Sequence, residues 1–244
     1  MHSALILLLG LLLTPIWGQA ANKESTKERA TMDTSQSLDE RQLALVPVAA
    51  FAAGGELDRL KDALNQALDA GMTVNDGKEV LVQLYAYAGF PRSLNALGTY
   101  MGVLEERREQ GINDVEGDTP QAPIPTGDDL LKQGTANQTE LAGAPVKGPL
   151  FDFAPSADEY LKTHLFGDIF ARDNLSWEDR EIATIAMLSA MEGVEPQLLA
   201  HVRIGMNTGL TENQLQQLAG VLAEQVGPEA AARLRAALDQ DLTP

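Results

Sequence analysis

The chain has 244 residues, of which 44% are hydrophobic, 22% charged and only 5% aromatic. Its 35 Asp and Glu residues outnumber its 18 Lys and Arg residues, so the formal net charge at pH 7 is −17. Such a surface repels phosphate backbones and anionic membranes, because nucleic-acid binding rests on Lys and Arg that neutralise phosphates. We therefore expect no nucleic-acid partner and, after removal of an amino-terminal signal, no membrane partner.

The chain contains no cysteine and only three histidines, His2, His164 and His201. The lack of cysteine excludes disulfides, thiolate catalysis and metal sites with Cys ligands. With so few histidines, we also expect no multi-His metal site within one chain.

An apolar run from Ala4 to Trp17 lies near the start of the chain and is followed by small residues. It is too short to span a bilayer comfortably, and Gly18 and Ala20 fit a cleavage site before Ala21. We therefore predict that residues 1–20 are a secretory signal peptide and that the mature protein is periplasmic or secreted from a bacterium. An uncleaved anchor is the alternative. Residues 21–36 are polar and lack aromatic side chains, so we expect a flexible segment there.

Signals for helix starts and ends mark the rest of the chain. In a capping box, two residues at a helix start each accept a hydrogen bond from the backbone N–H group of the other through their side chains. Four segments resemble this pattern: SLDE (37–40), TVND (73–76), SWED (176–179) and TENQ (211–214). Gly71 and Gly209 fit the position just after a helix, where a left-handed residue closes it. The helical segments are apolar over wide faces, and no alternating β pattern appears. We predict an all-α fold built as a buried helical bundle.

The helical segments form a unit that occurs twice. LDERQLALVPVAAFAAGG parallels WEDREIATIAMLSAMEG, which pairs Arg41 with Arg180 and Gly54 with Gly193. The next segments pair Gly71 with Gly209, and AYAGFPRSLNAL parallels EQVGPEAAARL, which pairs Gly89 with Gly227. An internal repeat of this kind determines the architecture of a fold.

The repeat divides the chain into segments. We expect a first repeat over residues 37–110, a linker rich in Pro and Gly over 111–150, and a second repeat over 151–244. The composition of the linker is compatible with an ordered crossing or with a flexible tether. Residues 154–176 contain another expected helix that leads into the second repeat.

The segment from Phe166 to Leu215, FGDIFARDNLSWEDREIATIAMLSAMEGVEPQLLAHVRIGMNTGLTENQL, resembles the carboxymuconolactone decarboxylase family. LVQLYAYAGFPRSLNAL in the first repeat resembles the closing Y-x-G-x-P signature of that family. The resemblance implies an all-α fold like that of alkyl hydroperoxidase D and assembly into homotrimers or other homo-oligomers; two fused copies should form a trimer. It also implies a lyase without a cofactor that removes CO₂ from a small carboxylated lactone.

The same resemblance suggests roles for individual residues. It places the functional histidine of the family at His201 and an acidic partner at Glu181, which can orient the ring or relay a proton. Arg172 matches an arginine of the family that could hold a substrate carboxylate, and Arg180 could pair with one as well. The positions of the Cys-x-x-Cys pair of the hydroperoxidase branch hold Val194 and Gln197, so the thiol chemistry of that branch is absent.

Each candidate has a structural alternative when the residues alone are considered. His201 could be a core or surface histidine, Glu181 a helix-start acid favoured by the helix dipole, and Arg172 a solvated arginine. Tyr85 and Tyr87 could line a pocket or pack in the core. We assign His164 to packing or to the surface.

The two repeats have lost different features. Ala63 and Gln42 stand in the first repeat where the second has His201 and Glu181, whereas the Y-x-G-x-P signature has eroded in the second. Either one composite site is built from both copies, or the protein has lost the original activity. The hypotheses are therefore an acid–base lyase acting on a small carboxylated lactone or related organic acid, and a non-catalytic oligomeric binding or scaffold protein. A peroxidase label inherited from the family lacks the cysteines that it requires.

Overall fold

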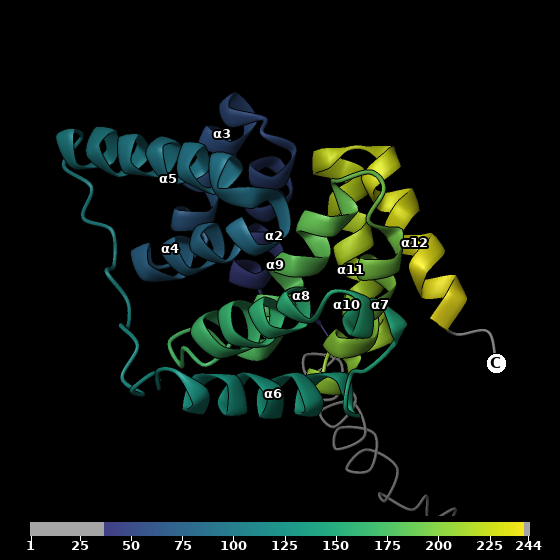
Figure 1. Cartoon of the computed structure of the whole chain (residues 1–244). Coiled ribbons are helices and arrows are strands. Elements are labelled where there is room, and N and C mark those ends of the chain that lie inside the picture. The colour runs from purple at the N-terminus through teal and green to yellow at the C-terminus, as the bar shows by residue number, and fades with distance from the viewer. Residues whose placement is uncertain (1–36, 242–244) are drawn as a thin grey trace, which may run out of the picture. The chain divides into compact units, whose positions relative to one another are not determined.

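A computed structural model describes residues 37–241 of the chain (Figure 1). The predicted signal peptide and the predicted flexible segment lie outside these residues. Regular structure between residues 37 and 241 is entirely helical, with no strand in that range, so the all-α prediction is confirmed. None of the helices described there is long and apolar enough to cross a membrane.

The first repeat consists of four helices, α2 (Glu40–Gly54), α3 (Leu57–Asp69), α4 (Val74–Gln83) and α5 (Tyr85–Glu109). A capping box begins α2, but its first residue is Asp39 and not Ser37, as the sequence predicted. Asp39 accepts a hydrogen bond from the Gln42 amide at 2.7 Å, and the Gln42 side chain accepts one from the Asp39 amide at 3.1 Å. A carboxylate accepts this bond as well as a hydroxyl does, and Gln42 supplies the reciprocal partner.

The long helix α5 is interrupted at Gly89, whose φ of 79° and ψ of 161° are not helical. A residue with a side chain would be strained at this positive φ, so glycine allows the chain to turn here. Pro91 then lies in the first turn of the resumed helix, where its missing N–H group costs no hydrogen bond. The interruption separates the short segment with Tyr85 and Tyr87 from the rest of α5.

The second repeat has the same order of helices, α9 (Trp177–Ser189), α10 (Glu195–Thr208), α11 (Glu212–Val221) with the π-helix η2 (Leu222–Val226), and α12 (Pro228–Asp241). Thr73 and Thr211 form the predicted capping boxes of α4 and α11, and Ser176 caps α9. The central helices α2 and α9 pack against each other (Figure 1), and nearly all their buried apolar residues belong to one hydrophobic core shared by both repeats.

The connection between the repeats is ordered by hydrogen bonds. The amides of Val74 and Asn75 bind the carbonyls of Val115 and Glu116, each at 2.9 Å. The Asp173 carboxylate then accepts hydrogen bonds from the amides of Gln121 and Ala122 at 2.8 and 3.0 Å. Of the two possibilities that the composition left open, the structure therefore has the ordered crossing.

Four helical segments lie between the crossing and α9, namely α6 (Asp128–Ala142), α7 (Pro149–Phe153), α8 (Pro155–Tyr160) and the π-helix η1 (Leu161–Ile169). The sequence indicated a helix near η1 but gave no sign of α6, which lies inside the range treated as a linker. Both α6 and η1 contribute to a second apolar cluster, which also includes Ile204 of α10. This cluster covers one face of the second repeat.

The packing of α6 on η1 depends on a close backbone approach at Gly134. A Cβ atom added there would lie only 1.8 Å from the carbonyl oxygen of Lys162. We expect Gly134→Ala to lower the free energy of unfolding by about 1–3 kcal/mol, as overpacking does in other cores. Urea unfolding followed by circular dichroism measures this change.

Gly98 in α5 provides the matched control, because an added Cβ there meets nothing within 4 Å. Gly98→Ala should raise the free energy of unfolding by about 0.5–1 kcal/mol through helix propensity. If both substitutions shifted stability in the same direction, the close approach of α6 to η1 would not be a packing constraint.

Candidate active site

His201 and Glu181 form a buried hydrogen-bonded pair. Their helices α9 and α10 pack against each other, and Nδ1 of His201 lies 2.8 Å from Oε2 of Glu181. The Glu181 side chain is fully buried, and 9% of the His201 side chain is exposed. A carboxylate at Nδ1 holds the ring in one orientation and directs Nε2 away from itself, which is the arrangement that acid–base chemistry requires.

Tyr87 of the first repeat reaches the same place. Its ring lies edge-on to the His201 imidazole, with ring centroids 5.3 Å apart and an interplanar angle of 78°. Burial, and next the charge of Glu181, raise the pKa of the Tyr87 hydroxyl well above its usual value, so the hydroxyl stays protonated. The structure therefore brings together three of the predicted site residues, and one of them comes from the other repeat.

Two oxygen atoms in this site are buried without a hydrogen-bond partner, Oε1 of Glu181 and the hydroxyl of Tyr87. The Tyr87 hydroxyl lies beside Thr184. The Thr184 hydroxyl accepts a hydrogen bond from Gln83 and donates its own proton to the Arg180 carbonyl, so it has no proton left to donate to Tyr87. A buried polar atom without a partner costs about 1–3 kcal/mol. Both oxygens therefore keep unused hydrogen-bonding capacity next to His201.

Arg180 lies beside this pair but faces the first repeat. It is fully buried, and its guanidinium donates hydrogen bonds to Glu79 at 3.0 Å and to Gln83 at 3.1 Å. Burial lowers the pKa of Arg180, and the Glu79 carboxylate opposes this shift by stabilising the charged form. A buried guanidinium that already has a carboxylate partner serves to join α9 to α4.

Arg172 also binds Glu79. Its Nε and Nη2 atoms donate bidentate hydrogen bonds to that carboxylate, and the shortest, from Nη2 to Oε1 of Glu79, is 2.7 Å. Burial raises the pKa of Glu79, but the hydrogen bonds from Arg172 and Arg180 outweigh it, so the net pKa is lowered. Both arginines predicted to hold a substrate carboxylate therefore hold a carboxylate of the protein.

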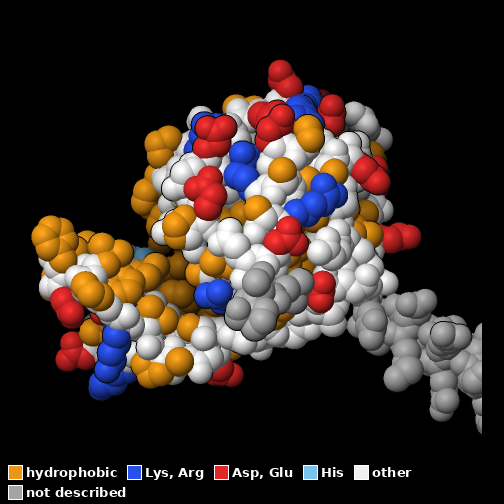
Figure 2. Space-filling model, turned by 90° about the vertical axis from the view of Figure 1, so that its right-hand side faces the viewer, with side chains coloured by type: hydrophobic (Ala, Val, Ile, Leu, Met, Phe, Trp, Pro, Cys, Tyr) orange, Lys and Arg blue, Asp and Glu red, His pale blue; other side chains and the backbone are white. Residues whose placement is uncertain are grey.

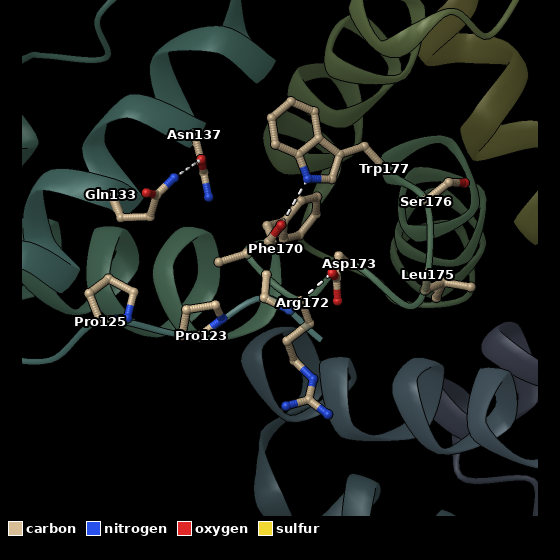
Figure 3. A pocket seen from close by; sticks show the side chains of 12 residues that line it. Pro123, Pro125, Gln133, Asn137, Phe170, Arg172, Asp173, Leu175, Ser176 and Trp177 are labelled. Atoms are coloured by element: carbon tan, nitrogen blue, oxygen red, sulfur yellow. Dashed lines mark hydrogen bonds between the residues drawn. The ribbon is translucent and has the colours of Figure 1, made fainter. Parts of the chain in front are cut away.

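Arg172 lines a cavity of about 390 Å³ between the ordered crossing, α6 and the turn before α9 (Figure 3). The walls include Pro123, Asn137 and Trp177, whose indole N–H donates to the Phe170 carbonyl at 2.8 Å. Figure 3 shows the Arg172 side chain extending away from the other lining residues. Neither His201 nor Glu181 is among the residues that line this cavity.

Tyr85 lies at the edge of the second apolar cluster, whereas His164 is on the surface. Tyr85 stacks on Phe90 with ring centroids 4.5 Å apart, and its pKa is raised by burial and by the charge of Asp168. His164 is exposed on η1 and pairs with Asp168 at 3.1 Å. Tyr85 therefore packs near the site, but no contact joins it to His201.

The sequence analysis did not single out Glu79, Gln83 or Thr184. Glu79, Gln83 and Tyr87 follow one another at intervals of four residues, which puts them on one side of the chain through α4 and the start of α5. That spacing was the available signal. The spacing does not reveal the partner of Glu79 and Gln83, because Arg180 lies about 100 residues further along the chain.

The first repeat lacks the acid–base pair at the equivalent positions. Gln42, the counterpart of Glu181, donates a hydrogen bond to Asp179 at 3.0 Å, and Ala63 replaces the histidine. Among the residues that the structure describes, no three His, Asp or Glu side chains converge as metal ligands would. The arrangement can therefore perform acid–base chemistry at one position, in the second repeat.

Comparison with known proteins agrees with this architecture. A model of the carboxymuconolactone decarboxylase family matches residues 24–99 and again residues 155–240. The chain is also 31% identical over 91 residues to 4-carboxymuconolactone decarboxylase of Acinetobacter baylyi, and the match covers 36% of this chain and 67% of that relative. The predicted resemblance and the predicted tandem arrangement are both confirmed.

The contact of Glu79 with Arg180 predicts a particular dependence of stability on pH. Because the pKa of Glu79 is lower in the folded protein, its ionised form stabilises the fold at pH values above the ordinary Glu pKa of about 4.3. This stabilisation is lost as the pH falls below that value and through the folded-state pKa. Glu79→Gln should lower the free energy of unfolding at pH 7 by about 3–5 kcal/mol, because Arg180 is left buried and unpaired.

Urea unfolding at pH 7, 5, 4 and 3 tests this prediction. The stability of Glu79→Gln should fall less than that of the wild type between pH 5 and 3. Glu106→Gln is the control, because Glu106 pairs with Lys61 on the surface and should matter little at any of these pH values. Equal stability of Glu79→Gln and wild type at pH 7 would show that the ion pair does not join the repeats.

Proposed function

This chain belongs to the carboxymuconolactone decarboxylase family, and we propose that it is a lyase without a cofactor in which His201 and Glu181 are the acid–base pair. The observation that carries the proposal is the buried contact of 2.8 Å between His201 Nδ1 and Glu181 Oε2. The proposed substrate is a small carboxylated lactone or a related organic acid.

The proposed reaction needs one proton donor. When the bond to the departing carboxylate breaks, CO₂ leaves and the electron pair of that bond spreads over the conjugated lactone as a dienolate. The protonated imidazole of His201 then gives its Nε2 proton to carbon, while Glu181 keeps the ring in place through Nδ1. The protonated hydroxyl of Tyr87, which lacks a partner inside the protein, can donate a hydrogen bond to the dienolate oxygen.

The predicted anchors of the substrate carboxylate are not equivalent. Arg172 remains the better candidate, because about one third of its side chain is exposed and its partner Glu79 could be exchanged for a substrate carboxylate. Arg180 is fully buried, so we assign it to positioning the helices. Tyr85 and Tyr87 remain the proposed apolar contacts of the substrate ring.

The alternative function is a non-catalytic oligomeric binding or scaffold protein. Two observations favour it: the first repeat lacks the acid–base pair, and only 9% of the His201 side chain is exposed. A peroxidase that uses thiols is excluded, because the chain has no cysteine.

Replacement of His201 by Gln distinguishes the lyase from the scaffold. In the lyase, the loss of the titrating group should lower the rate of CO₂ release about 10²–10⁴-fold. His164→Gln makes the same substitution on an exposed histidine of η1 and should leave the rate unchanged. A panel of carboxylated lactones, with CO₂ release as the readout and the melting temperature measured in parallel, provides the comparison.

Two outcomes would contradict the proposal that the protein is a lyase with His201 as its proton donor. Wild-type turnover in His201→Gln would remove this residue from the mechanism. A lower melting temperature, with activity falling only as far as the folded fraction falls, would make His201 a structural residue.

We also propose that the protein is exported and assembles as a homotrimer or other homo-oligomer. The Ala4–Trp17 segment supports export. Large apolar side chains exposed on α5, among them Phe90, Leu94 and Met101, support assembly. On the face drawn in Figure 2, hydrophobic side chains gather around a hollow on one side, and charged side chains are spread over the remainder.

Sedimentation of the chain without residues 1–20 measures the assembly. At micromolar concentration we expect the mass of a trimer, and Leu94→Glu together with Met101→Glu should shift it toward the monomer. Asp152→Lys, on a surface helix outside α5, is the control for a change of charge. A monomeric wild type would contradict the proposal.

A further inference from the structure

The first repeat has a pocket at the position that corresponds to His201. The repeat alignment pairs His201 with Ala63 and, through Gly89 and Gly227, pairs Tyr87 with Gln225. The ring of His201 in the second repeat lies against the ring of Tyr87 from the first repeat. Their counterparts Ala63 and Gln225 instead line a pocket of about 260 Å³, which we call the first-repeat pocket.

The walls of the first-repeat pocket are mostly apolar. Leu43, Ala44 and Pro47 of α2 line it together with Ala63 of α3 and Ala70, the residue that follows α3. The remaining lining residues are exposed at its rim: the carboxamides of Gln66 and Gln225 and the carboxylate of Glu40. The rim therefore offers hydrogen bonds to an uncharged polar group, and no Lys or Arg is among the lining residues.

The two repeats differ in what lies over this face. In the second repeat Ile204, the counterpart of Gln66, is buried in the apolar cluster that α6 and η1 form with α10. In addition, Asn207 of α10 donates a hydrogen bond to the carbonyl of Leu141 in α6 at 3.0 Å. The equivalent face of the first repeat carries the exposed Gln66 instead. The change from Ile to Gln suits a face that is open to water and to a solute.

We propose that the first-repeat pocket binds a small neutral molecule with one apolar ring and a hydroxyl or carbonyl group. The volume fits this class, because a cavity of about 150 Å³ already holds a benzene ring. Charge excludes a carboxylate, since Glu40 lies at the rim and the chain carries a net charge of −17. The ligand class thus differs from the carboxylated substrate proposed for His201, and the binding does not depend on that proposal.

Binding is tested with benzyl alcohol as the probe and with amide chemical shifts of the isotope-labelled full chain as the readout. We expect saturable shifts around Ala44, Ala63 and Gln225, with a dissociation constant of about 1–10 mM for so small a molecule. Benzoate, which has a similar size and carries a negative charge, should bind at least fivefold more weakly.

Two variants block the first-repeat pocket in different ways. Ala63→Leu fills it from the floor, and Gln225→Trp covers it from the exposed rim, so the second remains informative if the first disturbs the core. Each should weaken the binding of benzyl alcohol at least tenfold. His201→Gln serves as the control and should leave the dissociation constant within twofold of the wild type.

Several results would overturn the proposal. They are the absence of saturable shifts up to tens of millimolar, shifts centred on His201 and Tyr87, and equal binding of benzoate. Unchanged binding in a folded Gln225→Trp would do the same. Binding of benzyl alcohol to a chain without residues 1–36, but not to the full chain, would show that the amino-terminal segment fills the pocket in place of a free ligand.

Discussion

A guanidinium buried without solvent needs a negative partner, and the placement of Arg180 is the constraint on which the site depends. The partner is Glu79 on α4, held at 3.0 Å, and Gln83 one turn later binds a second nitrogen of the same group. These contacts fix α9 against α4. Because Tyr87 follows Gln83 by four residues, the same contacts bring the tyrosine ring to His201.

The duplicated unit has become asymmetric, because each copy keeps residues of the proposed site that the other copy lacks. The second repeat keeps the histidine and the glutamate, and the first keeps the tyrosine of the Y-x-G-x-P signature. Loss of a feature in one copy is tolerated when the other copy supplies it across a shared core. The apparent degeneration of each repeat is then consistent with a single composite site.

The covering elements follow the same asymmetry. The insertion before α9 places α6 and η1 in one apolar cluster with Ile204 of α10, and Tyr87, whose ring lies against His201, packs against this cluster. Exclusion of water strengthens the interaction between an imidazole and a carboxylate, because their charges are less screened. The corresponding face of the first repeat lacks the pair and keeps polar side chains at its edge.

The sequence by itself determined the all-α class, the repeat and the second-repeat pair. Helix caps and apolar faces are local signals, so Thr73 and Thr211 could be identified from neighbouring residues, whereas the resemblance to the family singled out His201 and Glu181. The absence of cysteine also settled which chemistry of the family was unavailable. These conclusions need no knowledge of how distant helices meet.

Only the tertiary structure decided which residues of the first repeat complete the site. Glu79 and Arg180 are 101 positions apart, and nothing in the residues around either one names the other. The partner of Arg172 and Arg180 was hidden for the same reason: an arginine binds whichever carboxylate the fold brings to it, and here that carboxylate is Glu79. The length and charge of a side chain are local properties, whereas its partner is set by the packing of α4 against α9.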